Sequence, residues 1–210
     1  MTDMLIEGFV CGLLETNTYV IGSGSACAIV DPSRGQRDVL DFVASRGLKA
    51  TRILLTHGHG DHIDGVREVR EAFPEAEIVC PADDEHMLAD AGANLSRMFG
   101  LTILAPPADV RVRPGETVSV GESSWRVLDT SGHTSGGVSY HCPEAGAAIV
   151  GDALFAGSIG RTDIPGGDTI RLIENIREQL LTLSEDTRIL PGHGPETTVA
   201  RERRSNPFLR

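Results

Sequence analysis

Short apolar runs separated by turn residues fill the first part of the chain. Residues Met4–Val10, Thr16–Ile21 and Ala26–Asp31 are rich in β-branched and apolar side chains, and glycines such as Gly12 separate them. Runs of this length bounded by glycine are typical of β-strands. The pattern therefore predicts three strands before residue 32.

Helical and strand-like periods then alternate. Apolar residues recur at helical spacing in Asp38–Arg46, which ends at Gly47, and Asp64–Phe73 ends before Pro74. Proline favours the first turn of a helix, so a further helix is expected after Pro81. In chain order, the predicted elements are helix Asp38–Arg46, strand Arg52–Thr56, helix Asp64–Phe73, strand Glu77–Cys80 and helix Ala82–Asp90.

The second half repeats this alternation after an irregular stretch. Residues 92–108 show no clear period and contain two prolines, so we expect a loop near the surface. The best-defined helix is Asp168–Leu183, with a predicted apolar stripe of Ile170, Ile173, Ile176, Leu180 and Leu183. The other predicted elements are strands Thr117–Val120, Ser124–Asp129, Val138–Cys142, Ala147–Val150 and Arg188–Leu190, and a short helix from Thr197.

Strands and helices in both halves indicate an α/β fold. Two sheets packed face to face, with helices covering their outer surfaces, would bury all of these apolar faces. The length of 210 residues fits a single domain over residues 1–210.

The charge balance argues against two classes of partner. Lys and Arg number 19 and Asp and Glu number 30, which gives a net charge of -11. Such a surface repels nucleic-acid phosphates and anionic lipid headgroups, and no large basic cluster compensates. No apolar run reaches the roughly 18 residues of a membrane span, and the acidic start does not suit a secretory signal. We therefore expect neither a nucleic-acid partner nor a membrane partner.

The four cysteines are dispersed along the chain and form no C-x-x-C pair. In a chain of this length, such spacing favours reduced, buried thiols in a reducing compartment. The sequence therefore predicts a cytoplasmic protein in which Cys11, Cys27, Cys80 and Cys142 are free.

Four metal-competent side chains directly follow the predicted strand Arg52–Thr56. They lie in Thr56-His57-Gly58-His59-Gly60-Asp61-His62. In an extended stretch, residues 57, 59 and 61 point to one side, and the glycines let His62 turn to join them. Asp64 then lies where a helix N-cap belongs. A polar loop holding these histidines by chance is the alternative, but three of the chain's seven histidines in six residues argue against it.

Three more candidate ligands follow predicted strands and have glycine neighbours. They are His133 after Ser124–Asp129, Asp152 after Ala147–Val150 and His193 after Arg188–Leu190. Singly, each is more simply a loop histidine or a turn aspartate. Together with the first four they make seven imidazole and carboxylate ligands, which suit zinc, iron or manganese. Seven is too many for one tetrahedral ion and fits two ions that share a carboxylate.

In these residues the chain resembles the metallo-β-lactamase fold superfamily. The pattern His57-Gly58-His59-Gly60-Asp61-His62, then His133, Asp152 and His193, covers nearly the whole chain. Within the superfamily, the chain is most similar to short glyoxalase II-type thioester hydrolases (hydroxyacylglutathione hydrolases). The resemblance implies a four-layer αββα sandwich of two mixed sheets, without the C-terminal helical domain of longer relatives. The local motifs are Asn17-Thr18-Tyr19, Gly160-Arg161-Thr162-Asp163-Ile164-Pro165 and Pro191-Gly192-His193-Gly194-Pro195-Glu196-Thr197.

The resemblance also implies roles for these residues. It implies two divalent ions, zinc first and iron or manganese as alternatives, and hydrolysis of a hydroxyacyl thioester such as S-lactoylglutathione by metal-bound hydroxide. A thiol with a pKa near 8.5 leaves as thiolate with little help from an acid. Asp61 and Asp152 are the expected catalytic residues, with Asp61 orienting the hydroxide. The expected ligands are His57, His59 and His133 for one ion, Asp61, His62 and His193 for the other, and Asp152 for both.

Arg161 has two interpretations. It resembles the family's basic residue beside the metals, which implies substrate binding, but a buried ion pair with Asp163 or Asp168 accounts for it equally well. The expected partner is a small-molecule thioester, and a monomer or small homo-oligomer is the expected assembly.

Other functions remain as alternatives. A mononuclear iron persulfide dioxygenase of the same superfamily shares the Gly-Arg-Thr-Asp stretch, but the context Gly192-His193-Gly194-Pro195 favours a hydrolase. A β-lactamase is disfavoured because Asp152 resembles a bridging carboxylate that those enzymes generally lack. The net charge opposes a nucleic-acid-processing enzyme. Seven intact ligands oppose a non-enzymatic metal-binding protein.

Overall fold

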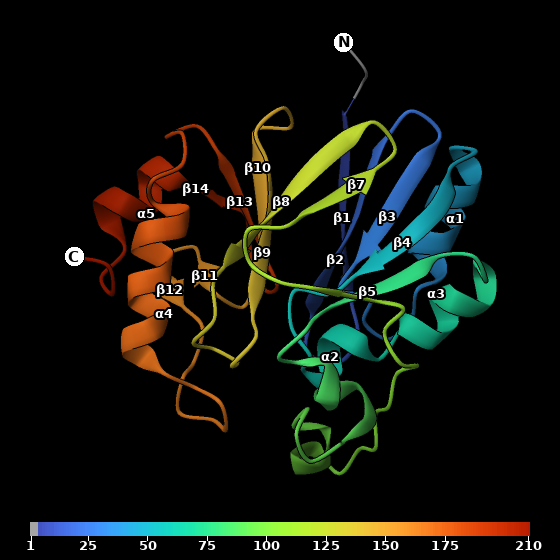
Figure 1. Ribbon diagram of the computed structural model, residues 1–210, viewed down its shortest axis with the longest axis horizontal. Coiled ribbons are helices and arrows are strands. Elements are labelled where there is room, and N and C mark those ends of the chain that lie inside the picture. Colours follow the sequence, from blue (N-terminus) through green and yellow to red (C-terminus); the bar gives the residue numbers. More distant parts are fainter. Residues whose placement is uncertain (1–3) are drawn as a thin grey trace.

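Two six-stranded sheets lie face to face in the computed structural model, which describes residues 4–210 (Figure 1). The first sheet has the order β1-β2-β3-β4-β5-β6 and the second the order β14-β13-β10-β9-β8-β7. The first comprises β1 (Met4–Cys11), β2 (Thr16–Ser23), β3 (Ala26–Val30), β4 (Lys49–Leu54), β5 (Glu77–Pro81) and β6 (Val110–Val112). The second comprises β7 (Thr117–Val120), β8 (Ser123–Asp129), β9 (Val138–Cys142), β10 (Ala147–Gly151), β13 (Arg188–Pro191) and β14 (Thr197–Thr198).

Helices cover the outer face of each sheet. Helices α1 (Arg37–Ser45) and α3 (Val66–Ala72) lie on the first sheet, and α4 (Thr169–Asn175) and α5 (Val199–Ser205) lie on the second (Figure 1). Three buried apolar clusters result, one under each helical layer and one between the sheets. The predicted four-layer αββα architecture is therefore confirmed.

Strand β3 shows why the middle of the molecule is so apolar. Cys27 and Ile29 belong to the cluster under α1 and α3, whereas Ala28 and Val30 belong to the cluster between the sheets. Successive side chains of a strand point to opposite faces, so a strand buried on both faces needs a continuous apolar run. Strand β3 pairs in parallel with β4, as expected for a strand inside such a layered fold.

The strand directions bring several loops to one edge of the sandwich. Strands β3, β4 and β5 run parallel to one another, and β10 runs parallel to β13. The segments that follow β3, β4, β10 and β13 therefore leave the sheets at a common edge, next to α2 (Gly60–Ile63) in Figure 1. A backbone bridge between Thr16 and His193 joins the two sheets there.

The predicted geometry of the histidine-rich turn was wrong in one respect. Residues 57–61 are not extended throughout, because Gly60 begins the short helix α2, with His59 as its N-cap. The Gly60 amide donates to the carbonyl of Asn94, so a distant loop fixes where this helix starts. Asp64 ends α2 and Gly65 precedes α3, so Asp64 is not an N-cap as predicted.

Two further predicted helices differ from the structure. Residues 82–90 form a turn and the 3-10 helix η1 (Glu85–Ala89) rather than an α-helix. The segment Asp168–Leu183 is α-helical only through Asn175 and continues as a π-helical turn, η3 (Ile176–Leu180). The buried stripe also differs from the predicted one at its start, since Leu172 is buried with Ile176 and Leu180, whereas Ile170 is exposed.

The segment 92–108 is more ordered than predicted. It contains the 3-10 helix η2 (Ser96–Phe99), and Asn94 and Ile103 are buried. Asn94 donates to the carbonyls of Met87 and Ile103, which closes the segment on itself. Four short strands were not predicted, namely β6, β11 (Leu154–Phe155), β12 (Ser158–Ile159) and β14, and the helix expected from Thr197 begins at Val199.

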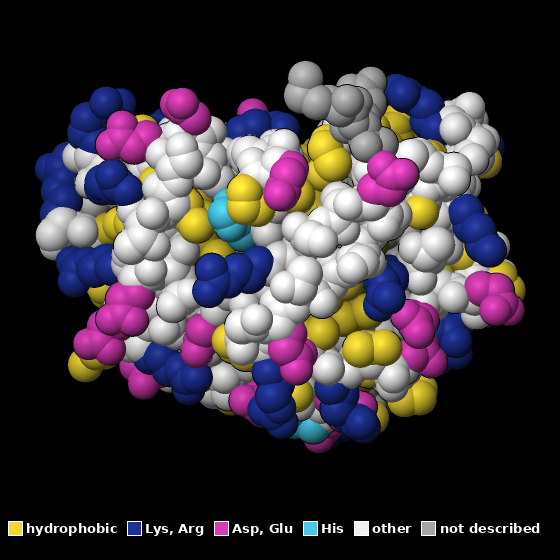
Figure 2. All heavy atoms as spheres, turned by 45° about the horizontal axis from the view of Figure 1, so that its top comes forward, with side chains coloured by type: hydrophobic (Ala, Val, Ile, Leu, Met, Phe, Trp, Pro, Cys, Tyr) yellow, Lys and Arg dark blue, Asp and Glu magenta, His cyan; other side chains and the backbone are white. Residues whose placement is uncertain are grey.

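Surface charges are mixed on the face seen in Figure 2. Basic and acidic side chains alternate there without a large patch of either sign. Within residues 4–210, no helix has the length and apolar character needed to cross a membrane. All four cysteines are free and buried, as predicted.

Candidate metal centre

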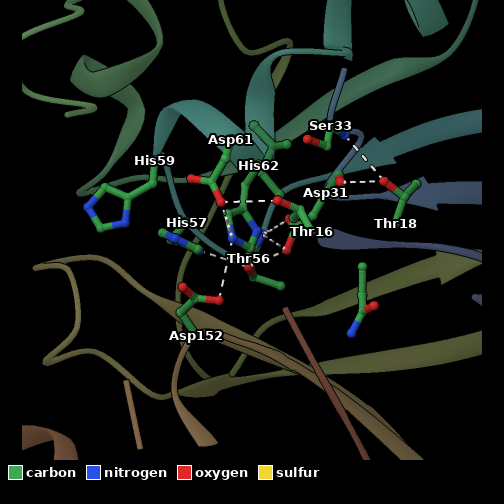
Figure 3. A network of polar contacts seen from close by, with 12 residues as sticks. Thr16, Thr18, Asp31, Ser33, Thr56, His57, His59, Asp61, His62 and Asp152 are labelled. Carbon is green, nitrogen blue, oxygen red and sulfur yellow. Dashed lines mark hydrogen bonds and ion pairs between the residues drawn. The ribbon is translucent and has the colours of Figure 1, made fainter. Parts of the chain in front are cut away.

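The structure brings all seven sequence-predicted ligands to one place at the common edge of the two sheets. The first four come from the turn after β4 and from α2, and the others come from the loops after β8, β10 and β13. Figure 3 shows several of them pointing toward one another. We call these residues the metal-ligand cluster: His57, His59, Asp61, His62, His133, Asp152 and His193.

The cluster divides into two groups of three ligands. The ligand atoms of His57, His59 and His133 lie within 4.8 Å of one another, and so do those of Asp61, His62 and His193. The second group is tight, since Oδ2 of Asp61 lies 3.2 Å from Nε2 of His193 and 3.4 Å from Nε2 of His62. Each group thus offers three donors to a single point, with one or more positions left open.

Asp152 lies between the two groups. Its Oδ1 is 3.4 Å from Nε2 of His62, and its Oδ2 is 3.5 Å from Nε2 of His133 and 3.6 Å from Nε2 of His193. One carboxylate therefore faces ligands of both groups. This is the arrangement that two cations sharing a bridging ligand require.

Unpartnered buried atoms test whether a cation fits. Nε2 of His57, Nε2 of His62 and Oδ1 of Asp152 are buried and have no hydrogen-bond partner within residues 4–210. Buried polar atoms nearly always have a partner, so a convergent set without one needs an explanation. The donor set of imidazole nitrogens and carboxylate oxygens is the one that divalent transition metals accept, so the residues fit a metal centre.

Asp31 orients two of the histidines, a role that the sequence analysis missed. Nδ1 of His62 lies 3.0 Å from Oδ2 of Asp31, and the Thr56 hydroxyl donates to the same oxygen at 2.6 Å (Figure 3). Because the hydroxyl proton is used in this way, Nδ1 of His57, 3.0 Å from Thr56 Oγ1, must be the donor of that contact. When the two rings are neutral, as metal binding requires, these contacts hold the proton on Nδ1 and leave Nε2 of each ring facing the centre.

A weak sequence signal for Asp31 did exist. It is an aspartate directly after a buried parallel strand, followed by proline. In the structure it is buried and has a φ of 48°, which is unusual for a residue other than glycine. Such strain often marks a functional residue, but only the fold shows that Thr56 and His62 are its partners.

Backbone carbonyls orient two more histidines. Nδ1 of His133 donates to the carbonyl of Arg161 at 2.7 Å, and Nδ1 of His193 donates to the carbonyl of Leu14 at 3.0 Å. His59 differs, since its Nδ1 lies 2.9 Å from Nε2 of His133. His59 thus faces the centre with Nδ1, whereas the other four histidines face it with Nε2.

The motif Asn17-Thr18-Tyr19 holds the loop that carries His193. The Asn17 side chain donates to the carbonyls of Pro191 and Gly194, and the Tyr19 hydroxyl donates to the carbonyl of Pro191. Gly192 in this loop has no room for a side chain, because an added Cβ would overlap Asp152 and His62. The motif therefore positions a ligand across the two sheets.

Asp84 joins the two histidine-bearing loops and was also missed. Its buried carboxylate accepts from the amides of Gly58 and Gly136 and from the Thr134 hydroxyl. Gly58 lies between two ligands of the cluster, and Thr134 follows His133. Asp84 thus connects the turn after β4 with the loop after β8.

The electrostatics of the cluster favour a bound cation. Burial, with the nearby imidazoles, lowers the pKa of His57 well below its ordinary value, and burial and His133 lower that of His59 to about 3. Both rings are therefore neutral, which is the metal-binding form. Burial would also lower the pKa of His62, but Asp61 and Asp152 raise it well above its ordinary value. The negative charges of Asp61 and Asp152 therefore stabilise a positive charge at this position, either a proton on His62 or a bound cation.

Arg161 is not in a buried ion pair. Its guanidinium is exposed and makes a two-point contact with Asp163, with Nε 2.9 Å from Oδ1 and Nη2 3.0 Å from Oδ2. The predicted ion pair of Arg161 is therefore found with Asp163, but it is exposed and not buried as predicted. The side chain lies at a cavity that also contacts the cluster.

That cavity has a volume of about 480 Å³ and opens beside the cluster. His59, Asp61, His133, Asp152 and His193 face it from one side. Much of the remaining wall comes from the turn between β1 and β2 and from the segment around η2, and Ser33, Asp64, Arg161 and Ile164 complete it. A small molecule in this cavity would therefore touch the metal-ligand cluster directly.

Comparison with protein families agrees with this geometry. A family model described as "Metallo-beta-lactamase superfamily" matches residues 11–193. The chain is 40% identical to "Probable metallo-hydrolase YqgX" of Bacillus subtilis over 94% of both chains. It is 35% identical to "Hydroxyacylglutathione hydrolase GloC" of Haemophilus influenzae, over 87% of this chain and 86% of that one.

Solved structures show the same similarity. The BLEG-1 B3 metallo-beta-lactamase superposes with a TM-score of 0.93 at 34% identity, covering 98% of this chain and 99% of that chain. TTHA1623 in a di-iron-bound form gives a TM-score of 0.86 at 36% identity, covering 97% and 100%. ETHE1 from Myxococcus xanthus gives a TM-score of 0.80 at 31% identity, covering 97% of this chain and 84% of that chain.

Proposed function

Because this chain belongs to the metallo-beta-lactamase superfamily, we propose that it is a dinuclear metal-dependent hydrolase that cleaves a hydroxyacyl thioester such as S-lactoylglutathione. The observation that carries the proposal is the position of Asp152, whose two oxygens face ligands of both groups of the cluster. The similarity to GloC, named a hydroxyacylglutathione hydrolase, supports the thioester, and the di-iron form of TTHA1623 supports two ions.

The residues divide between two ions as their geometry suggests. Zinc, iron and manganese all suit nitrogen and oxygen donors. When bound, two such ions would lower the pKa of water between them and polarise a substrate carbonyl. We assign His57, His59 and His133 to one ion, Asp61, His62 and His193 to the other, and Asp152 to both.

Asp61 has a second task in this proposal. Its contacts with Thr16, His62 and His193 all use Oδ2. Its Oδ1 is then available to accept a hydrogen bond from water at the cavity, which orients that water toward the carbonyl carbon. Thr16 holds the carboxylate in place by donating to Oδ2 at 3.1 Å.

Arg161 is proposed as a contact for the substrate. Its Nε and Nη2 are occupied by Asp163, so Nη1 remains for a substrate oxygen. The departing sulfur needs no acid, since a thiol of pKa near 8.5 leaves as thiolate at neutral pH. No general acid is therefore needed to protonate the departing sulfur.

Metal analysis and two activity assays on one preparation test the proposal. We expect about two ions per chain by elemental analysis, hydrolysis of S-lactoylglutathione, and loss of hydrolysis on chelation. His59→Ala should abolish hydrolysis while circular dichroism stays that of the wild type. Oxygen uptake with glutathione persulfide by a protein that holds one iron, without thioester hydrolysis, would instead support a mononuclear iron persulfide dioxygenase.

A further inference from the structure

Exposed apolar side chains concentrate at the cavity beside the cluster. Eight large apolar residues within residues 4–210 are exposed, and four of them line this cavity. Two lie in the turn between β1 and β2 and two in η2, in the green segment below α2 in Figure 1. We call these four the apolar rim: Leu13, Leu14, Met98 and Phe99. Exposed apolar groups gathered at one opening are typical of a binding surface.

The apolar surface continues from the rim toward the metal-ligand cluster. Leu101, Ile103 and Ile164 line the same cavity, together with His59 and His133 of the cluster. Leu13 is 77% exposed, Met98 73% and Phe99 63%, so a ligand chain lying between them would bury much apolar area. Apolar side chains make up much of the cavity wall, and Ser33, Asn94 and Ser96 lie among them.

The charges at the cavity do not suit an anionic carrier. Arg161 is the one Lys or Arg side chain among the described residues that line it, and Asp163 already binds two of its three guanidinium nitrogens, which leaves Nη1 for a substrate. Asp64 at the opening is paired with Arg34 at 2.7 Å. A tripeptide such as glutathione carries two carboxylates, and the side chains described at the cavity offer them only the partly occupied guanidinium of Arg161.

We propose that the substrate carries an uncharged, apolar arm next to the scissile thioester, and that the apolar rim binds this arm. This inference rests on the proposed thioester hydrolysis and narrows its substrate class. In the reaction, the water oxygen forms a bond to the carbonyl carbon and the carbon–sulfur bond breaks, with its electron pair leaving on the thiolate. The two protons of the water pass to solvent, and the acyl product is a carboxylate. The arm itself does not react, so its contribution is binding and orientation.

A series of acyl thioesters on one neutral carrier tests the proposal. Acetyl, butanoyl, hexanoyl and octanoyl thioesters of N-acetylcysteamine differ only in chain length. We expect kcat/KM to rise by up to about fourfold for each CH2 group that the rim buries. Acetyl thioesters of alkanethiols of increasing length show whether the arm is on the acyl or the thiol side. S-Lactoyl-N-acetylcysteamine should be hydrolysed at least as well as S-lactoylglutathione.

Matched variants test whether the apolar rim causes the predicted rise of kcat/KM with chain length. Phe99→Ser should flatten the dependence of kcat/KM on chain length, and Met98→Ser should reduce it. Phe208→Ser is the control, because Phe208 is also a half-exposed phenylalanine but does not line the cavity. It should retain the wild-type dependence. An unchanged slope in Phe99→Ser would contradict the assignment to the rim.

A binding measurement separates this proposal from the proposed reaction. S-Alkyl thioethers of N-acetylcysteamine cannot be hydrolysed, and calorimetry should show Kd falling as their alkyl chain lengthens. If neither Kd nor kcat/KM depends on chain length, the proposal of an apolar arm is wrong, but the proposed hydrolase activity is unaffected. If Kd falls with chain length but the metal-loaded protein hydrolyses no thioester, the proposed reaction is wrong, and the apolar binding site is still supported.

Discussion

The two sides of the cavity are built on opposite principles. The metal-ligand cluster is polar and largely buried, and nearly every ligand has a partner that fixes its orientation, such as Asp31 for His62. The apolar rim is exposed, and its side chains project from a turn and a 3-10 helix. The difference indicates that the cluster determines which chemistry is available, whereas the rim determines which molecules are admitted. Substitutions on the two sides should therefore have effects of different size and kind.

Removing the carboxylate between the two ligand groups should have the largest effect. In Asp152→Ala, we expect kcat/KM to fall by more than the roughly 10–100-fold that outer partners of metal ligands cost. Elemental analysis should find fewer ions per chain than in the wild type. Asp64→Ala is the control, because Asp64 lines the same cavity without belonging to the cluster. Wild-type metal content in Asp152→Ala would contradict the shared-ligand geometry.

Disturbing the orientation of the ligands should weaken metal binding without removing a ligand. Asp31→Asn replaces an oxygen that accepts from Thr56 and His62 with a group that accepts from only one side, so metal affinity should fall by about 10–100-fold. Competition with a chromophoric chelator measures the affinity. Thr56→Val should also weaken binding, whereas Thr56→Ser keeps the hydroxyl and should bind as the wild type does. Equal affinities in the valine and serine variants would argue against the hydrogen-bond chain.

Breaking the connection between the histidine loops should lower stability. Asp84→Ala leaves the amides of Gly58 and Gly136 and the Thr134 hydroxyl without their acceptor. We expect the free energy of unfolding to fall by about 1–3 kcal/mol, as for other buried groups that lose a partner. Urea unfolding in the presence of a chelator measures this effect apart from metal binding. Asp83→Ala, at an exposed neighbouring carboxylate, should change it by less than about 0.5 kcal/mol.

Asp84 should also make a smaller contribution to the free energy of unfolding that depends on pH. Burial raises the pKa of Asp84 above its ordinary value, although Thr134 and Gly136 oppose the shift. Protonation of this carboxyl is therefore easier in the folded chain than in the unfolded chain. This contribution to stability is full below the unfolded pKa of about 3.9 and is lost as the pH rises through the folded pKa.

Urea titrations at a series of pH values should show this loss. The difference in unfolding free energy between the wild type and Asp84→Asn should decrease as the pH rises through that window. Asp83→Asn, measured in parallel, should show no such trend. A difference that grows with pH would mean that the hydrogen bonds outweigh burial.

Changes at the rim should leave the cluster intact. Phe99 is 63% exposed, so Phe99→Ser should alter the free energy of unfolding by less than about 0.5 kcal/mol. Elemental analysis should find the wild-type number of ions. A loss of metal in this variant would show that the two sides of the cavity are coupled and would break the comparison.

Local patterns were sufficient to predict most elements of the fold. Alternating and continuous apolar runs identified the main strands, including β3 and β10, because a strand buried on one or both faces needs such a run. Patterns failed where a long-range contact decides the local conformation. The Gly60 amide at the start of α2 donates to the carbonyl of Asn94. Asp84 makes long-range hydrogen bonds in the segment where an α-helix was predicted over Ala82–Asp90.

The candidate site divides in the same way. The seven ligands were predictable because imidazoles and carboxylates beside glycine, directly after strands, are rare without a purpose. Asp31 and Asp84 were not, because an isolated aspartate in a loop has many roles. Their partners lie 25 to 52 residues away in the chain, and only packing brings them within hydrogen-bond distance.

The sequence alone determined the kinds of atoms that this protein offers to a metal and the layers into which its apolar runs must fold, since both depend on residue type and spacing. The family resemblance already implied how the ligands divide around Asp152, but only the tertiary structure shows that they meet there and that an apolar rim stands beside them. The division depends on loops from two sheets meeting at one edge, and the rim depends on a turn and a 3-10 helix from distant parts of the chain. Such convergence is a property of packing, and no local pattern records it.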